Sequence, residues 1–201
     1  MEARKATIKR KTGETDIELS INLDGTGKYS IETGVPFFNH MLDLLSKHSL
    51  IDMDIKASGD IDVDYHHLIE DVALALGQAF SDALGERRGI NRYGFWVLPM
   101  DESIAKAEVC LDLGGRPYLV YEFANEKSFI RDFDTDIFKH FWRSFADTAK
   151  MNLHIEQKYG EDLHHAHEAV FKAVARALRM ACTADTRALD AIPSSKGTLS
   201  D

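Results

Sequence analysis

The chain has 201 residues, of which 44% are hydrophobic and 28% are charged, and its formal net charge is −9. This composition is typical of a folded globular protein, and the negative charge argues against a nucleic-acid-binding surface, which needs a basic face. No apolar run reaches the roughly 20 residues that cross a bilayer, and the N-terminus lacks the apolar segment of a signal peptide. Cys110 and Cys182 have no metal-type spacing, so we expect two buried free thiols in a reducing cytoplasm.

The first half of the chain predicts four strands and two helices. In residues 16–23 apolar and polar side chains alternate, as they do in a strand with one buried face. Pro36 marks the start of the first helix, since proline suits the first helical turn. Strands are expected at 5–11, 16–23, 28–33 and 51–57, and helices at 36–46 and 65–84.

The second half repeats this order of elements. Strands are expected at 91–98, 104–113, 118–123 and 152–157, and helices at 136–150 and 163–184. Both halves therefore read β-β-β-α-β-α, which predicts an internally duplicated α+β fold in which two helices cover one face of each sheet. We divide the chain into residues 1–88 and residues 89–201, the second part including a polar C-terminal tail, and expect both parts to form one catalytic unit.

A histidine motif occurs once in each half. It consists of two adjacent histidines, a glutamate four residues after the first of them, and one more histidine upstream. In the first half these residues are His66, His67, Glu70 and His40; in the second half they are His164, His165, Glu168 and His140. Imidazole and carboxylate groups suit zinc, manganese, iron, cobalt or nickel, so the motif predicts a metal site that is built twice.

Helix geometry divides these eight residues between two ions. Residues four apart share a helix face, whereas adjacent residues diverge by about 100°. His66 and Glu70 can therefore bind one ion, while His67 points elsewhere, and each ion keeps open positions for substrate or water. Pseudo-symmetry predicts two sets of ligands: His66, Glu70, His140 and His165 around one ion, and His40, His67, His164 and Glu168 around the other.

Four neighbouring residues have less distinctive patterns. We expect His167 to be exposed and His154 to have a structural role on its strand. Asp71 should pack against the helix or orient a metal ligand. His48 fits either a helix end or the wall of the site.

Seven short blocks, in order along the chain, are similar to blocks of the imidazoleglycerol-phosphate dehydratase family. They lie at 10–15, 37–42, 66–71, 99–102, 115–117, 164–168 and 193–197. Leu68 stands where the family often has threonine, and Gly114 where it often has serine, but neither is a ligand position. The resemblance therefore extends over essentially the whole chain.

This resemblance implies a fold of the ribosomal protein S5 domain 2 type and two Mn²⁺ ions per active site, although other divalent metals are compatible. It also implies a homo-oligomer of 24 subunits with active sites at the subunit interfaces, without nucleic-acid or membrane partners. The implied reaction removes water from the small phosphorylated imidazole D-erythro-imidazoleglycerol phosphate. The product would be imidazoleacetol phosphate, an intermediate of histidine biosynthesis.

The resemblance further implies roles for single residues. It assigns catalysis to Glu14, Glu168 and His67, with Glu14 as the acid/base that also contacts substrate. The residues that match the phosphate side of the site are Arg92, Arg116, Lys172, Ser194 and Lys196. We expect Arg116 to point inward and the tail to cover the substrate phosphate.

Two other functions stay open on the sequence. A binuclear phosphoesterase or amidohydrolase would use a metal-bound hydroxide as its nucleophile, although such sites usually contain more aspartate. A non-enzymatic metal-binding shell protein would use its ions only to join subunits. In that protein Arg92, Arg116 and Lys196 would have no role near the metals.

Overall fold

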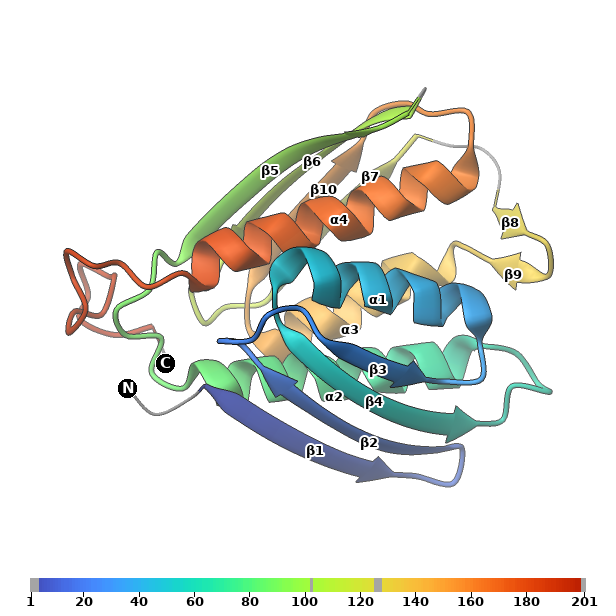
Figure 1. Cartoon of the computed structure of the whole chain (residues 1–201), viewed down its shortest axis with the longest axis horizontal. Helices are drawn as coiled ribbons and strands as arrows, with labels where there is room; N and C mark the ends of the chain where they lie inside the picture. The colour runs from blue at the N-terminus through green and yellow to red at the C-terminus, as the bar shows by residue number, and fades with distance from the viewer. Residues whose placement is uncertain (1–3, 102, 125–127, 200–201) are drawn as a thin grey trace.

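The computed structural model describes residues 4–101, 103–124 and 128–199. In Figure 1 the helices lie between two outer sheets, each of which has four strands in the described part of the chain. In strand order, the first sheet contains β1 (Lys5–Lys11), β2 (Thr15–Asn22), β4 (Asp52–Gly59) and β3 (Tyr29–Glu32). The second sheet contains β5 (Tyr93–Met100), β6 (Ser103–Asp112), β10 (Asn152–Gln157) and β7 (Tyr118–Phe123).

The two sheets are built alike, which confirms the predicted duplication. In each sheet the strands pair antiparallel except the last strand, because β3 runs parallel to β4 and β7 runs parallel to β10. A small hairpin of β8 (Phe129–Ile130) and β9 (Phe133–Asp134) was not predicted. It is only two residues per strand, too short for periodicity to reveal.

The helices cover the inner face of each sheet, as predicted. α1 (Pro36–Ser49) and α2 (His66–Leu84) pack on the first sheet, and α3 (Ile137–Ala149) and α4 (Leu163–Cys182) pack on the second. Between the two halves, α1 contacts α4 and α2 contacts α3. Among the described residues, no helix is both long and apolar enough to span a bilayer.

Alternating burial on the strands and apolar stripes on the helices create the core. On β2, Ile17 and Leu19 are buried while Glu18 between them is exposed. The centre of the molecule is aromatic, with Phe141 and Trp142 of α3 fully buried. α2 and α3 approach closely at Gly77, where an added Cβ would collide with Thr148. This close approach fixes the position of one histidine-bearing helix relative to the other.

α1 is longer than predicted, ending at Ser49 and not at Ser46. The hydroxyl of Ser46 donates to the Ile51 carbonyl at 2.7 Å, and that of Ser49 donates to the Ser46 carbonyl at 3.2 Å. Buried serines satisfied in this way can continue a helix, although serine alone suggests a helix end. Leu50 then ends the helix in a left-handed conformation, with φ 62°.

All four helices begin at the same end of the molecule, on the right of Figure 1, whereas the C-terminal tail lies at the opposite end. The tail is tied to the link between the halves, because the Gly89 amide donates to the Ala191 carbonyl at 2.9 Å. The division at residues 88 and 89 stays a prediction. Glu102, the last residue of one family-like block, lies outside the described residues.

Candidate metal centre

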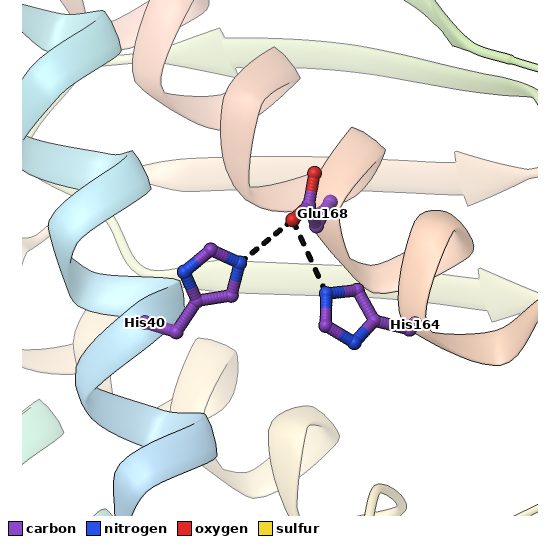
Figure 2. A group of neighbouring side chains, drawn as sticks. All are labelled: His40, His164 and Glu168. Carbon is purple, nitrogen blue, oxygen red and sulfur yellow. Dashed lines mark hydrogen bonds and ion pairs between the residues drawn. The ribbon is translucent and has the colours of Figure 1, made fainter.

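The first two turns of α1 and α4 bring together three of the predicted ligands, shown in Figure 2. The Glu168 carboxylate oxygen Oε1 lies 2.7 Å from Nε2 of His40 and 3.2 Å from Nε2 of His164. Among the described residues, this is the only group of three or more potential metal ligands whose donor atoms all lie within 4.8 Å of one another. Two imidazole nitrogens and one carboxylate oxygen form a donor set that fits a divalent transition metal.

Local sequence explains why these side chains converge. His164 and Glu168 are four residues apart on α4 and therefore share a face. Asp162 caps this helix, since its carboxylate accepts hydrogen bonds from the amides of His164 and His165 at 2.8 and 3.1 Å. The contact between α1 and α4 then supplies His40 from the other half of the chain.

Glu168 is a buried carboxylate that stays ionised. Burial raises its pKa, but hydrogen bonds from Lys172 and His40 outweigh this effect and lower the pKa to about 2. Nζ of Lys172 lies 2.5 Å from Oε2 of Glu168, one helical turn further along α4. Lys172 is thus the predicted phosphate-side residue that the structure places directly beside the predicted metal ligands.

A second group forms where α2 meets α3. Nε2 of His66 lies 3.7 Å from Oε2 of Glu70, and the rings of His66 and His140 are 4.9 Å apart between centroids. Ser144 donates to Glu70 at 3.2 Å and so holds this carboxylate against α3. His66 and His140 also line a cavity of about 460 Å³ that includes Asp64. His66, Glu70 and His140 are three of the four residues predicted to bind one ion.

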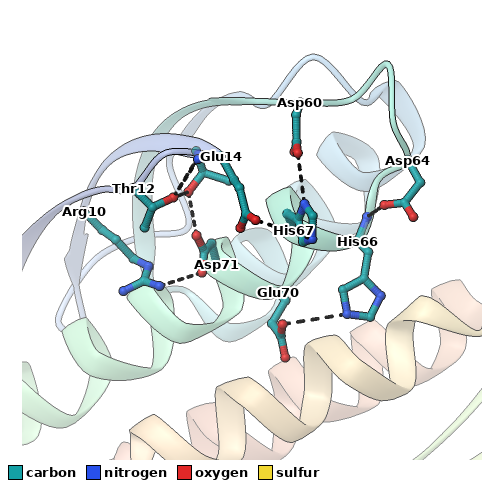
Figure 3. Close-up of polar contacts among 10 residues, drawn as sticks. Arg10, Thr12, Glu14, Asp60, Asp64, His66, His67, Glu70 and Asp71 are labelled. Carbon is teal, nitrogen blue, oxygen red and sulfur yellow. Dashed lines mark hydrogen bonds and ion pairs between the residues drawn. The ribbon is translucent and has the colours of Figure 1, made fainter.

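His67 points away from this group, toward the β1–β2 hairpin (Figure 3). Its Nδ1 lies 3.0 Å from the Asp60 carboxylate, and its Nε2 lies 3.9 Å from Glu14. The hydrogen bond with Asp60 is the main reason why the pKa of His67 is raised. A carboxylate on one ring nitrogen leaves the other nitrogen to face a metal ion. Asp60 was not predicted, because nothing in its local pattern separates it from a surface aspartate.

Adjacent histidines diverge in both copies of the motif. The rings of His66 and His67 are 6.2 Å apart at 78°, and those of His164 and His165 are 6.1 Å apart at 84°. The structure thus brings together His40, His164 and Glu168, and separately His66, Glu70 and His140. The assignment of His67 and His165 as the fourth ligands stays a prediction.

The remaining phosphate-side residues lie far from these groups. The Arg92 amide donates to the Ala181 carbonyl of α4 at 3.0 Å. Ala181 lies thirteen residues beyond Glu168 on the same helix, a distance of about 20 Å along the helix axis. The Arg92 side chain pairs with Asp112 at 2.6 Å and donates to the Pro193 carbonyl at 2.7 Å. The tail with Ser194 and Lys196 therefore lies beside Arg92.

Arg116 is exposed, two residues before the start of β7, so the prediction that it points inward was wrong for the single chain. The backbone carbonyl of Arg116 accepts from the Asn152 side chain at 2.5 Å, just beyond the C-terminal end of α3. Arg116 thus shares the end of the molecule that holds Arg92 and the tail.

Two further predictions about single side chains were wrong. His167 is only 1% exposed, because α4 is enclosed on this side and the His167 ring stacks on Phe123 at 4.4 Å. Burial lowers the pKa of His167 to about 3. Cys110 is exposed on the outer face of the second sheet, whereas Cys182 is a buried free thiol as expected.

The structure places His48, for which the sequence left two interpretations, in the last turn of α1, which fits the helix-end interpretation. It is half-buried two turns after His40 on α1. Burial lowers its pKa, and the nearby cations Lys172 and Arg176 lower it further. A neutral imidazole near Lys172 adds a hydrogen-bonding group to this side of the metal centre.

Comparisons with known proteins show the family to which this chain is related. The sequence model of the imidazoleglycerol-phosphate dehydratase family matches residues 33–178. The chain is 51% identical over 197 residues to the imidazoleglycerol-phosphate dehydratase of Gluconacetobacter diazotrophicus, covering 98% of each. It is 53% identical over 196 residues to that of Ruegeria pomeroyi, covering 98% of this chain and 100% of the relative.

Solved structures show the same fold. The structure of imidazoleglycerol-phosphate dehydratase from Staphylococcus aureus subsp. aureus N315 superposes with a TM-score of 0.80 at 36% identity, covering 90% of this chain and 99% of that one. The structure of the enzyme from Pyrococcus furiosus in complex with (S)-C348 has a TM-score of 0.80 at 33% identity. The match covers 95% of this chain and 99% of that one. The chain therefore belongs to the imidazoleglycerol-phosphate dehydratase family, whose members are hydro-lyases of histidine biosynthesis.

Proposed function

We propose that the chain removes water from D-erythro-imidazoleglycerol phosphate with two Mn²⁺ ions per active site. One ion would be held by His40, His164 and Glu168 with His67, and the other by His66, Glu70 and His140 with His165. The observation that carries this proposal is the convergence of His40, His164 and Glu168 within 4.8 Å. Three imidazoles and one carboxylate per ion suit manganese among other divalent metals.

Bound metal ions would supply positive charge, and the protein would supply the groups that transfer protons. Bound divalent ions stabilise negative charge on the groups that they contact, including an imidazole ring. Glu14 lies 3.9 Å from His67, close enough to the predicted ligands to move a proton at the substrate carbon chain. Lys172 neutralises Glu168 and offers a cation for the substrate phosphate.

We further propose that each active site is assembled from different subunits of a 24-subunit homo-oligomer. In the three-carbon chain of the substrate, ring and phosphate are separated by less than about 10 Å at ordinary bond lengths. Arg92 and Glu168 of one chain are held about 20 Å apart along α4. A substrate bound at His40 and Glu168 therefore needs Arg92, Arg116, Ser194 and Lys196 from another copy.

The remaining parts of the proposal follow from the sequence. The two half-repeats, 1–88 and 89–201, would act as one catalytic unit, because each predicted ion takes ligands from both. The C-terminal tail would cover the substrate phosphate in the assembled site. A free buried thiol at Cys182 is consistent with the cytoplasm as the location.

Removing the metal is expected to abolish activity. Protein stripped with a chelator should give no imidazoleacetol phosphate, and added Mn²⁺ should restore turnover with about two ions bound per chain, since each ion has its own predicted ligand set. Product formation and metal content are measured on the same samples. Full turnover by stripped protein would contradict the proposal, and hydrolysis of simple phosphoesters by the manganese form would favour a hydrolase instead.

Mixing two inactive variants should restore activity if active sites join subunits. Glu168→Gln damages the metal side and Arg116→Ala the phosphate side, so each alone should be inactive. In oligomers assembled from equal amounts of both, about a quarter of the sites should combine two undamaged sides. The control is an oligomer assembled in the same way from the double variant Glu168→Gln/Arg116→Ala alone. Recovery no greater than this control would contradict an active site built between subunits.

A further inference from the structure

Beside the metal ligands lies a buried carboxylate to which the proposed reaction assigns no role. Asp71 follows Glu70 on α2, and its residue is only 8% exposed. Its Oδ1 accepts a hydrogen bond of 2.8 Å from Arg10 (Figure 3). Its Oδ2 accepts one of 2.5 Å from the hydroxyl of Thr15. A carboxylate buried this deeply needs such partners, and both partners belong to the hairpin that carries Glu14.

A chain of hydrogen bonds continues from Asp71 to the backbone of Glu14. Since the Thr15 hydroxyl donates to Asp71, the Thr15 oxygen is left to accept from the hydroxyl of Thr12, 3.2 Å away. The Thr12 oxygen in turn accepts from the amides of Glu14 and Thr15 at 3.1 and 3.0 Å. Connected hydrogen bonds polarise and strengthen one another, so a charge at Asp71 reinforces the turn conformation at Glu14.

The other side of the turn is held by the residue that orients His67. The Asp60 amide donates to the Glu14 carbonyl at 3.2 Å, and the Asp60 carboxylate lies 3.0 Å from His67. His67 and Asp71 are four residues apart and share one face of α2. The helix that presents the metal ligand His67 therefore also anchors, through Asp71, the turn that presents Glu14.

We infer that Asp71 is a positioning residue, which acts through the hydroxyls of Thr15 and Thr12 to hold the Glu14 carboxylate beside His67 for proton transfer. This inference rests on the proposed acid/base role of Glu14. The Glu14 side chain is 56% exposed, so packing around its carboxylate is sparse and the turn backbone determines where the side chain starts. Small misplacements of a catalytic group reduce the rate far more than they reduce binding.

The test removes the central hydroxyl of this chain without changing its shape. Thr15→Val should lower kcat by roughly 10- to 100-fold, with metal content and KM close to wild type. Thr15→Ser keeps the hydroxyl and should restore turnover. Lys9→Ala, on the exposed face of the same hairpin, is the matched control and should match wild type. If Thr15→Val does not fold, Thr12→Val and Thr12→Ser break and restore the next link at an exposed position.

A double-mutant cycle decides whether the hydroxyl acts through Glu14. In a Glu14→Gln background, Thr15→Val should lower the remaining kcat by less than about twofold, because coupled residues are not additive. An equal loss in both backgrounds would overturn the inference. So would wild-type kcat in Thr15→Val when Glu14→Gln is inactive, and this result would leave the role of Glu14 intact. Wild-type turnover by Glu14→Gln would overturn both the role of Glu14 and the inference.

Discussion

Replacing Glu168 by glutamine is expected to abolish turnover and to release the ion at His40 and His164. Glu168 is the carboxylate shared by both histidines, at 2.7 and 3.2 Å, and its lowered pKa keeps it charged at neutral pH. An amide of the same size keeps the packing but loses the charge that binds a cation. Loss of a direct ligand should cost more than the roughly 100-fold in metal affinity that an outer partner costs.

The measurement combines kcat with the number of metal ions bound per chain. Glu161→Gln, an exposed acidic residue just before the same helix, is the matched control and should retain both metal ions and full turnover. A Glu168→Gln protein that binds two ions per chain and stays active would show that this carboxylate is not a ligand. Glu168 would then serve as the ion-pair partner of Lys172.

The pairing of candidate ligands on one helix could be predicted from the sequence because helix periodicity links them. His164 and Glu168 are four residues apart on one helix, and the duplicated motif pointed to His40 as a partner in the other half. The structure brings these three residues together as predicted. The spacing within a helix is fixed by 3.6 residues per turn, so such short-range geometry needs no knowledge of the tertiary structure.

Contacts between distant segments were not predictable in this way. The hydrogen bond between Thr15 and Asp71 joins residues 56 apart, and no periodic pattern announces it. His167 was expected on the surface, but α4 contacts both α1 and the second sheet, and the ring of Phe123 in that sheet stacks on His167. Which faces of a helix are enclosed depends on what packs around it, and that information is absent from the helix sequence alone.

Arg116 shows a different limit of what can be predicted from the sequence. The family resemblance expects it at the substrate, whereas in one chain it is exposed at the end of the molecule that is remote from the metal ligands. An exposed cation on one chain can line the active site of a neighbouring chain. The role of Arg116 at the substrate therefore stays a prediction, and it requires an active site that is shared between chains.

Replacing Glu14 by glutamine is expected to lower kcat by roughly 10²- to 10⁴-fold, the usual contribution of a positioned acid/base. Unlike Glu168, Glu14 lies 3.9 Å from its nearest histidine and is more than half exposed. Its replacement should therefore leave two metal ions bound per chain. Substrate affinity should change far less than kcat, because glutamine has the same shape and can still accept a hydrogen bond.

The different results expected for Glu168 and Glu14 make the proposed acid/base role of Glu14 testable. Glu18→Gln, on the exposed face of β2, is the control for losing a negative charge on this hairpin and should behave as wild type. If Glu14→Gln loses metal ions together with activity, Glu14 is a ligand and the site has a different coordination. If it retains both metal and turnover, another group transfers the proton, and His67 with its raised pKa becomes the next residue to replace.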